Sequence, residues 1–168
     1  MLPLSGEPAQ PAGAKRNVAP ATHAEAGKLR HMRYLAIDLG DKRTGLATGD
    51  DDTKLVSPVG VLEIPRGQAL VDAILKSISA HEPGAIIIGL PLHMDGTEGD
   101  RAKIAREFAS DLTKHCDLPM HFQDERLTSY AADQRMARSG RTHKQKKRIR
   151  DALAAAEILR DFLESENI

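Results

Sequence analysis

The sequence lacks tryptophan, has only 3% aromatic residues and contains one cysteine, Cys116. A single cysteine excludes an internal disulfide and fits a reducing compartment, so we expect a cytoplasmic protein. No apolar run approaches the ~20 residues of a membrane-spanning helix, and we therefore expect no membrane partner. The scarcity of aromatic side chains argues against a module that binds single strands mainly by stacking bases on aromatic platforms.

The first 31 residues differ in composition from the rest of the chain. They hold four prolines and many alanines without a periodic apolar pattern, which predicts a disordered N-terminal extension over residues 1–31. The extension lacks the apolar core of a secretory signal; a transit peptide or an upstream start site is the alternative. We expect residues 32–168 to form a single domain.

Apolar patterning from Met32 onward predicts strands that alternate with helices. We expect strands at Tyr34–Leu39, Gly45–Thr48, Val56–Ile64, Ala85–Leu90 and Pro119–Asp124. We expect helices at Gln68–Ala80, after the loop Pro91–Gly99 with Thr97 in its capping box, at Leu127–Ala137 and at Ile149–Glu164.

The order of these elements predicts an α/β fold with a mixed five-stranded sheet flanked by helices. Three strands joined by short turns favour an antiparallel arrangement, and two later strands separated by helices favour parallel crossovers. Pro58 favours an edge position for the third strand, because proline cannot donate to a neighbouring strand.

Acidic residues stand where strands of such a sheet end. Asp38 ends the first strand, and Asp124 and Glu125 close the last one. Asp151 falls within the apolar arc of the last helix, whereas Glu157 falls on the opposite, polar arc. Each residue alone has a plain explanation as a turn former, an Arg126 partner or a helix-start acid. Together they predict a site for Mg²⁺ or Mn²⁺, with two ions suited to phosphodiester hydrolysis.

Basic residues gather just before Asp151. Eight basic residues and no acidic residue lie between Gln134 and Arg150, which leaves 16 basic against 24 acidic residues elsewhere in a chain of zero net charge. Such a strip is the electrostatic footprint of nucleic-acid binding, although a solvated linker would look similar. Gly40 and Gly45 are expected to allow the turn after Asp38. The candidate substrate-binding residues are Lys42, Arg43, Arg126, Lys146, Lys147 and Arg148.

Four segments together resemble one known family. They are Asp38–Ala47 (DLGDKRTGLA), Gly89–Gly99 (GLPLHMDGTEG), Asp124–Thr128 (DERLT) and Lys146–Ala156 (KKRIRDALAAA). This set is similar to the YqgF family, whose members are described as pre-16S rRNA nucleases and as Holliday-junction-resolvase-like proteins. His93 departs from the asparagine common in that loop, which leaves its role open.

The resemblance implies a fold, an activity and a ligand set. The fold is ribonuclease-H-like with three layers, and the activity is a hydrolase that trims the 5′ end of precursor 16S rRNA in the bacterial cytoplasm. The catalytic metal ligands implied are Asp38, Glu125 and Asp151, with Asp124 as the alternate to Glu125; that choice rests on the family.

Three other functions stay open at the level of sequence. One is an actin-like or sugar-kinase-like nucleotide domain, which also places an Asp-x-Gly turn on its first strand. Another is a Holliday-junction resolvase acting on branched DNA, which needs a symmetric dimer. The last is a catalytically inactive RNA-binding factor. We expect a nucleic-acid partner, with precursor rRNA preferred over branched DNA, and a monomer or weak homodimer.

Overall fold

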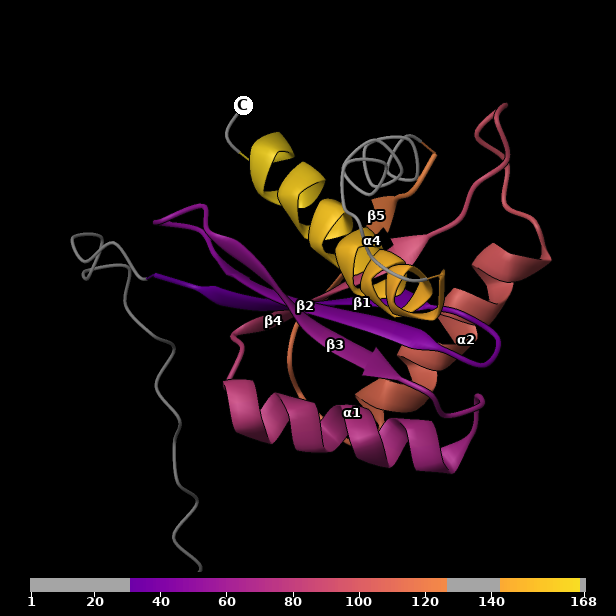
Figure 1. The fold of residues 1–168 in the computed structure, drawn as a ribbon, viewed down its shortest axis with the longest axis horizontal. Coiled ribbons are helices and arrows are strands. Elements are labelled where there is room, and N and C mark those ends of the chain that lie inside the picture. Colours follow the sequence, from indigo (N-terminus) through magenta and orange to yellow (C-terminus); the bar gives the residue numbers. More distant parts are fainter. Residues whose placement is uncertain (1–30, 127–142, 167–168) are drawn as a thin grey trace, which may run out of the picture. The chain divides into compact units, whose positions relative to one another are not determined.

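Five strands form one mixed sheet in the order β3-β2-β1-β4-β5 (Figure 1). The structure is a computed structural model that describes residues 31–126 and 143–166, without the side chains of 143–148. The strands are β1 (Arg33–Leu39), β2 (Thr44–Asp50), β3 (Val56–Leu62), β4 (Ala85–Leu90) and β5 (Met120–Asp124). The pairs β1–β2 and β2–β3 are antiparallel, and the pairs β1–β4 and β4–β5 are parallel. The predicted α/β class and strand pattern are confirmed.

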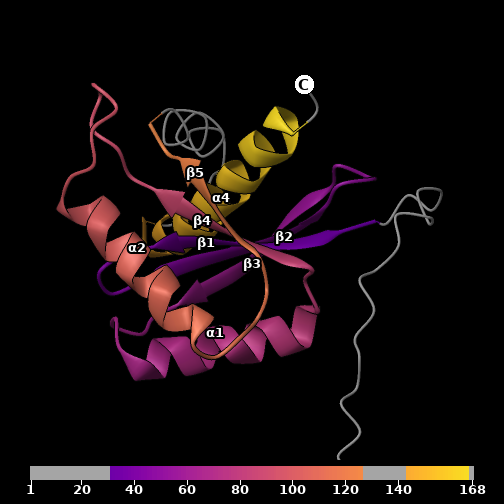
Figure 2. The same ribbon diagram turned by 180° about the vertical axis from the view of Figure 1, so that it is seen from behind.

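Helices cover both faces of the sheet, which gives the three layers of a ribonuclease-H-like fold (Figure 2). Helices α1 (Gln68–His81) and α2 (Asp100–Thr113) pack on one face, where Ile37, Leu46 and Ile88 are buried with them. Helix α4 (His143–Ser165) packs on the other face, against Ala36 and Ile87. None of the described helices is long and apolar enough to cross a membrane.

Local sequence explains why the sheet has this order. All six residues of β4 are buried, as expected for a strand between two neighbours and covered on both faces. Strand β3, which contains Pro58, lies at the edge as predicted. Helix α1 ends at Glu82, whose φ of 47° lies in the left-handed region and stops the helix before Pro83.

Several sequence-based expectations differ from the structure. The predicted capping box is wrong, because α2 begins at Asp100 after Gly99 and Thr97 belongs to the preceding loop. Glu157 is not on a solvent-facing surface: it is 4% exposed, and Arg160 donates to it at 2.5 Å. The last helix begins at His143, six residues before the predicted start. All but the last residue of the predicted extension 1–31, and the predicted helix Leu127–Ala137, lie outside the described residues.

Candidate active site

Asp38 lies near the end of β1, flanked by a glycine on each neighbouring strand. It pairs with Gly45 of β2, and the parallel register that pairs Ile37 with Ile88 sets Asp38 beside Gly89 of β4. Side chains alternate along a strand, so Asp38 shares a face with Ala36 and points toward the α4 layer. Because glycine has no side chain, Gly45 and Gly89 leave room on both sides of Asp38 for other groups.

Gly45 lets the backbone of α4 approach the sheet. A Cβ built on Gly45 would stand 2.0 Å from the carbonyl oxygen of Asp151, so only glycine fits beneath this helix turn. The contact brings Asp151 next to Asp38. The turn after Asp38 depends instead on Gly40, whose N–H donates to the Arg43 oxygen at 2.9 Å. The expectation that Gly45 serves the turn is therefore wrong.

Gly89 makes the corresponding room on the other side of Asp38. A Cβ on Gly89 would stand 1.8 Å from Oε1 of Glu125 and 2.7 Å from Cδ1 of Ile158. Glu125 follows β5 directly, and its N–H donates to the Leu90 oxygen at 3.2 Å. Its carboxylate therefore lies over the backbone of β4, between the sheet and α4.

Burial and mutual repulsion raise the proton affinity of two of these acids. The pKa of Glu125 is raised from 4.5 to about 8, first by burial and then by Asp38, with Arg101 acting in the opposite direction. The pKa of Asp38 is raised from 3.8 to about 6 by burial and by Asp151, again opposed by Arg101. A cation bound at this acidic centre, Asp38, Glu125 and Asp151, would offset the repulsion that raises these two pKa values.

Asp124, the neighbour of Glu125, has a different environment. It accepts hydrogen bonds from the backbone N–H of Arg126 at 3.0 Å and from its Nε at 2.7 Å. The side-chain bond to Arg126 is the main cause that lowers the pKa of Asp124. The two consecutive acids thus face different partners, and only Glu125 shares the enclosed region with Asp38.

Arg43, among the predicted cations whose side chains are described, contacts the acidic centre. Its Nη1 is 3.6 Å from Oδ2 of Asp151, and its Nη2 is 3.8 Å from Oε1 of Glu63. Both Nη1 and Oδ2 are buried without a hydrogen-bond partner. A buried carboxylate oxygen without a donor is suited to a metal ion, because such an oxygen is costly to leave unsatisfied.

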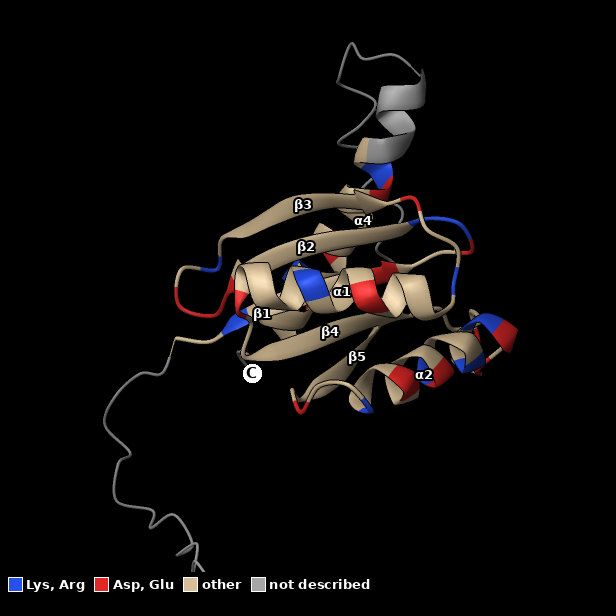
Figure 3. Cartoon of the chain, turned by 90° about the horizontal axis from the view of Figure 1, so that it is seen from below, with Lys and Arg blue, Asp and Glu red and all other residues tan. Residues whose placement is uncertain are grey.

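The other predicted cations are placed less directly. Lys42 is exposed in the β1–β2 turn, where charged residues of both signs adjoin the start of α2 (Figure 3). Arg126 is held by Asp124. Residues Lys146, Lys147 and Arg148 lie in the first turns of α4, ahead of Asp151, and their side chains are outside the description.

Arg101 is a residue of the site that sequence reasoning missed. It stands in the first turn of α2 and lowers the pKa of both Asp38 and Glu125. Its Nη2 is 3.8 Å from Oδ2 of Asp41, which Arg66 also contacts at 3.3 Å. An exposed arginine in a helix with ordinary amphipathic spacing carries no local signal of a site; only the packing of α2 beside the β1–β2 turn reveals it.

The spacing of the acids bears on how many ions they could hold. Among the side chains described, one group of acid and histidine ligand atoms lies within 4.8 Å of one another, namely His31, Asp50 and Asp51. That group is at the other end of β1, where Arg33 pairs with Asp50. The acidic centre is therefore wider than the shell of a single ion with three direct carboxylate ligands.

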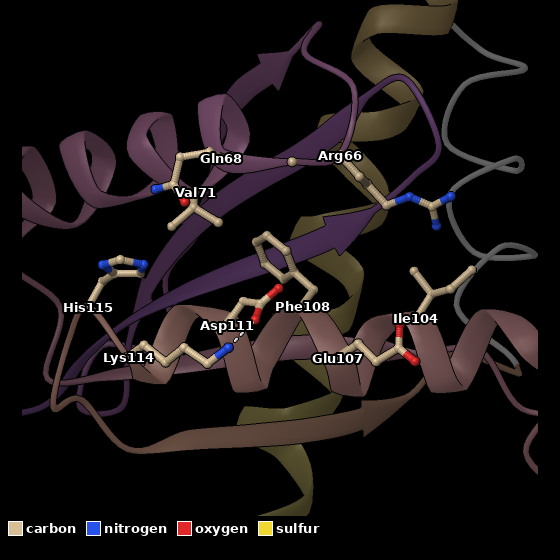
Figure 4. Close-up of a pocket in the computed structure, with 10 residues that line it drawn as sticks. Arg66, Gln68, Val71, Ile104, Glu107, Phe108, Asp111, Lys114 and His115 are labelled. Atoms are coloured by element: carbon tan, nitrogen blue, oxygen red, sulfur yellow. Dashed lines mark hydrogen bonds and ion pairs between the residues drawn. The ribbon is translucent and has the colours of Figure 1, made fainter.

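A groove of about 490 Å³ lies between α1 and α2, on the sheet face opposite the acidic centre (Figure 4). Val71 and Phe108 form its apolar part, and Asp111 pairs with Lys114 at 2.7 Å within it. Its place behind the sheet separates it from the acids, so the groove is not the catalytic cleft.

Comparison with known proteins places the whole described fold in one family. The RuvX family, described as Holliday junction resolvase, matches residues 32–165. A protein of Anaeromyxobacter sp. (strain Fw109-5) named "Putative pre-16S rRNA nuclease" is 37% identical over 81% of this chain and 99% of its own length. A protein of the same name from Maridesulfovibrio salexigens is 38% identical over 79% of this chain and 98% of its own length.

Solved structures of resolvases share the fold at low sequence identity. T. thermophilus RuvC in complex with a Holliday junction substrate aligns with a TM-score of 0.51 and 13% identity, over 82% of this chain and 96% of that chain. The Fowlpox virus resolvase in complex with Holliday junction DNA aligns with a TM-score of 0.52 and 11% identity, over 80% and 99%.

The fold and the family matches together define a phosphodiester-hydrolysing enzyme, a nuclease with a ribonuclease-H-like fold. Within that class the chain belongs to the RuvX family, also called YqgF, as the four sequence segments indicated.

Proposed function

We propose that this enzyme is a divalent-metal-dependent endonuclease that processes the 5′ end of precursor 16S rRNA in the cytoplasm. The observation that carries the proposal is the acidic centre itself, in which two glycines let Glu125 and Asp151 close in on Asp38. The names of full-length relatives at 37–38% identity support rRNA as the substrate.

The acidic centre suits Mg²⁺ or Mn²⁺ because its donors are carboxylate oxygens, which these hard cations prefer. Asp38, Glu125 and Asp151 would hold the ions. We expect two ions ~3.5–4 Å apart, the arrangement suited to phosphodiester hydrolysis. Divalent ions at such a site activate water and stabilise the leaving oxygen of a phosphodiester.

The surrounding cations would position the substrate. Arg43 is within ion-pair distance of Asp151 and so within reach of a phosphate at the acidic centre. Lys42 and Arg126 border the same end of the sheet, and the basic residues between 135 and 150 lead toward it along the sequence. Contacts of this kind hold the phosphate backbone without reading its sequence.

A cleavage assay with two substrates tests the proposal. Precursor 16S rRNA and a four-way DNA junction are incubated side by side with Mg²⁺ or Mn²⁺ and with wild type, Asp38→Asn or Asp151→Asn. We expect wild type to cut the rRNA and both variants to lose at least about 100-fold in rate. Asp52→Asn, at the opposite end of the sheet, is the matched control. Metal-dependent cleavage that survives Asp38→Asn contradicts the proposed site.

The second candidate function is resolution of Holliday junctions, because the family description carries that name. Cleavage of the junction alone would favour it, and a symmetric dimer would then be required. Wild type that binds rRNA but cuts neither substrate would instead favour an RNA-binding factor.

A further inference from the structure

The loop between β4 and α2 forms a small hairpin that projects beyond the sheet (Figures 1 and 2). Leu92 and Glu98 form an isolated antiparallel bridge at its base. The N–H of His93 donates to the Thr97 oxygen at 2.9 Å, and that of Gly96 donates to the His93 oxygen at 2.8 Å. Gly96 has a φ of 84°, so the turn needs the freedom of glycine there.

Side chains hold this hairpin in one geometry. Asp95 accepts hydrogen bonds from the N–H of Thr97 at 2.9 Å and from its hydroxyl at 2.6 Å. The Nε of Arg106 on α2 donates to both oxygens of Glu98 at 2.9 Å. A contact set this dense fixes the turn before any ligand arrives, which lowers the entropy cost of binding.

Met94 stands at the tip of the hairpin with an unusually exposed side chain. It is 80% exposed, the highest value among the large hydrophobic residues that the structure describes. Covering exposed apolar surface is favourable, by about 25 cal/mol per Å². A turn held in one geometry that exposes one apolar side chain is the arrangement expected of a residue that contacts a ligand.

The tip contacts the segment that follows β5. The Met94 carbonyl accepts a hydrogen bond from Nη1 of Arg126 at 3.4 Å, and Arg126 directly follows Glu125 in the sequence. Arg126 is paired with Asp124, whereas the Glu125 carboxylate lies over Gly89 on the α4 side of the sheet, so a nucleic acid that reaches both Glu125 and Met94 crosses the end of β5.

The chemistry of the tip favours a base over a phosphate. Between Pro91 and Gly99 the acids Asp95 and Glu98 outnumber the one basic residue, His93. Arg126 is already held by Asp124. Residues 91–99 contain no lysine or arginine to hold a phosphate, whereas a methionine side chain can insert between stacked bases and contact their faces through sulfur.

We propose that Met94 is a specificity-determining residue that inserts between bases of a double-helical or branched nucleic acid beside the bond that is cut. The proposal rests on the proposed nuclease function, and it adds a preference for base-paired substrate. The inserted side chain would unstack one base step and hold the strand over the acidic centre.

The test compares paired and single-stranded substrates of the same sequence. Met94→Ala should lower the rate of duplex cleavage about 10-fold, equivalent to about 1.4 kcal/mol, and change single-strand cleavage less than about 2-fold. Met94→Leu should restore the duplex rate to within about 3-fold. Leu55→Ala removes another exposed apolar side chain, 71% exposed and outside the site, and should change neither rate. A fall of equal size on both substrates overturns the proposal.

A fluorescence readout separates this proposal from the cleavage chemistry. Duplexes carrying 2-aminopurine at successive positions are mixed with the Asp38→Asn chain, with and without Met94→Ala. We expect a rise in fluorescence at one or two adjacent positions that is lost with Met94→Ala. If this rise is seen but wild type cuts no substrate, the proposed insertion of Met94 is retained and the proposed nuclease function is contradicted. If fluorescence rises at no position, or if Met94→Ala changes only self-association, the proposed insertion of Met94 is overturned.

Discussion

Glu125 and Gly89 are in direct contact: a Cβ on Gly89 would stand 1.8 Å from the Glu125 carboxylate. The contact fixes Glu125 over the backbone of a fully buried strand, beside Asp38 on the next strand. Glu125 follows β5 and would otherwise be free to move. It is held in one position because Gly89 on β4 has no side chain to displace it.

Gly89→Ala should abolish cleavage while the chain still folds. The new methyl group occupies the place of the carboxylate oxygen, so Glu125 must turn away from Asp38, and we expect at least about a 100-fold loss in kcat. Overpacking should also cost about 1–3 kcal/mol of stability. Gly84→Ala is the control, because its Cβ would stand 3.0 Å from Cγ of the flexible Met32 side chain and at an ordinary 3.8 Å from the Arg33 backbone oxygen. Circular dichroism and cleavage kinetics check both; full activity of Gly89→Ala would show that Glu125 needs no fixed position.

The consecutive acids at the end of β5 should differ in their effect on activity. Glu125→Gln removes a carboxylate from the acidic centre, and we expect metal-dependent cleavage to fall at least about 100-fold. Asp124→Asn weakens the contact with Arg126 and should cost less than about 10-fold. Calorimetric titration of both variants with Mn²⁺ tests whether Mn²⁺ binding is also weakened more by Glu125→Gln than by Asp124→Asn. A larger loss for Asp124→Asn would assign the metal to the alternate ligand.

The metal-free protein should lose stability as the pH rises from about 4 to 8. Asp38 and Glu125 have pKa values of about 6 and 8 in the folded chain, above their ordinary 3.8 and 4.5. The folded chain therefore holds more protons than the unfolded chain across this range, and ionisation favours unfolding.

Asp38→Asn should remove part of this loss, by on the order of 3 kcal/mol at pH 8. Denaturant titrations in a chelator, at pH 5 and pH 8, compare the variant with wild type and with Asp52→Asn. Acids whose pKa is lowered in the folded chain, such as Asp124, increase stability as the pH rises. They are present in wild type and in both variants, so they do not affect the comparison. Equal pH dependence of Asp38→Asn and wild type would mean that Asp38 is not enclosed with other acids.

Substrate binding should weaken steeply with salt. Each phosphate contact made by a cation contributes a slope of about −0.7 to −0.9 in log K against log salt. Replacing Lys146, Lys147 and Arg148 with glutamine should reduce the slope by two to three such contacts and leave kcat at saturating substrate nearly unchanged. Lys76 on α1 and Lys114 at the C-terminal end of α2 supply control substitutions away from the site. A slope that stays the same would exclude the three residues from the binding surface.

The sequence was a good guide to the strands and a partial guide to the site. The strands and their antiparallel and parallel arrangement were predicted from apolar patterning and element order, and Asp38, Asp124 and Glu125 became candidates because they stand at strand ends. Sequence alone could not distinguish Asp124 from Glu125, because the difference arises from contacts with Arg126 and Gly89. The burial of Glu157 escaped a helical-wheel argument, which assumes that a charged residue faces water unless a partner such as Arg160 is known.

The close fit between Gly45 and the Asp151 backbone joins two parts of the chain that lie more than a hundred residues apart in sequence. Any change that shifts α4 along the sheet therefore moves Asp151 relative to Asp38, although α4 carries no other member of the acidic centre. The geometry of the acidic centre is thus a property of the packing between α4 and the sheet as much as of the strand ends.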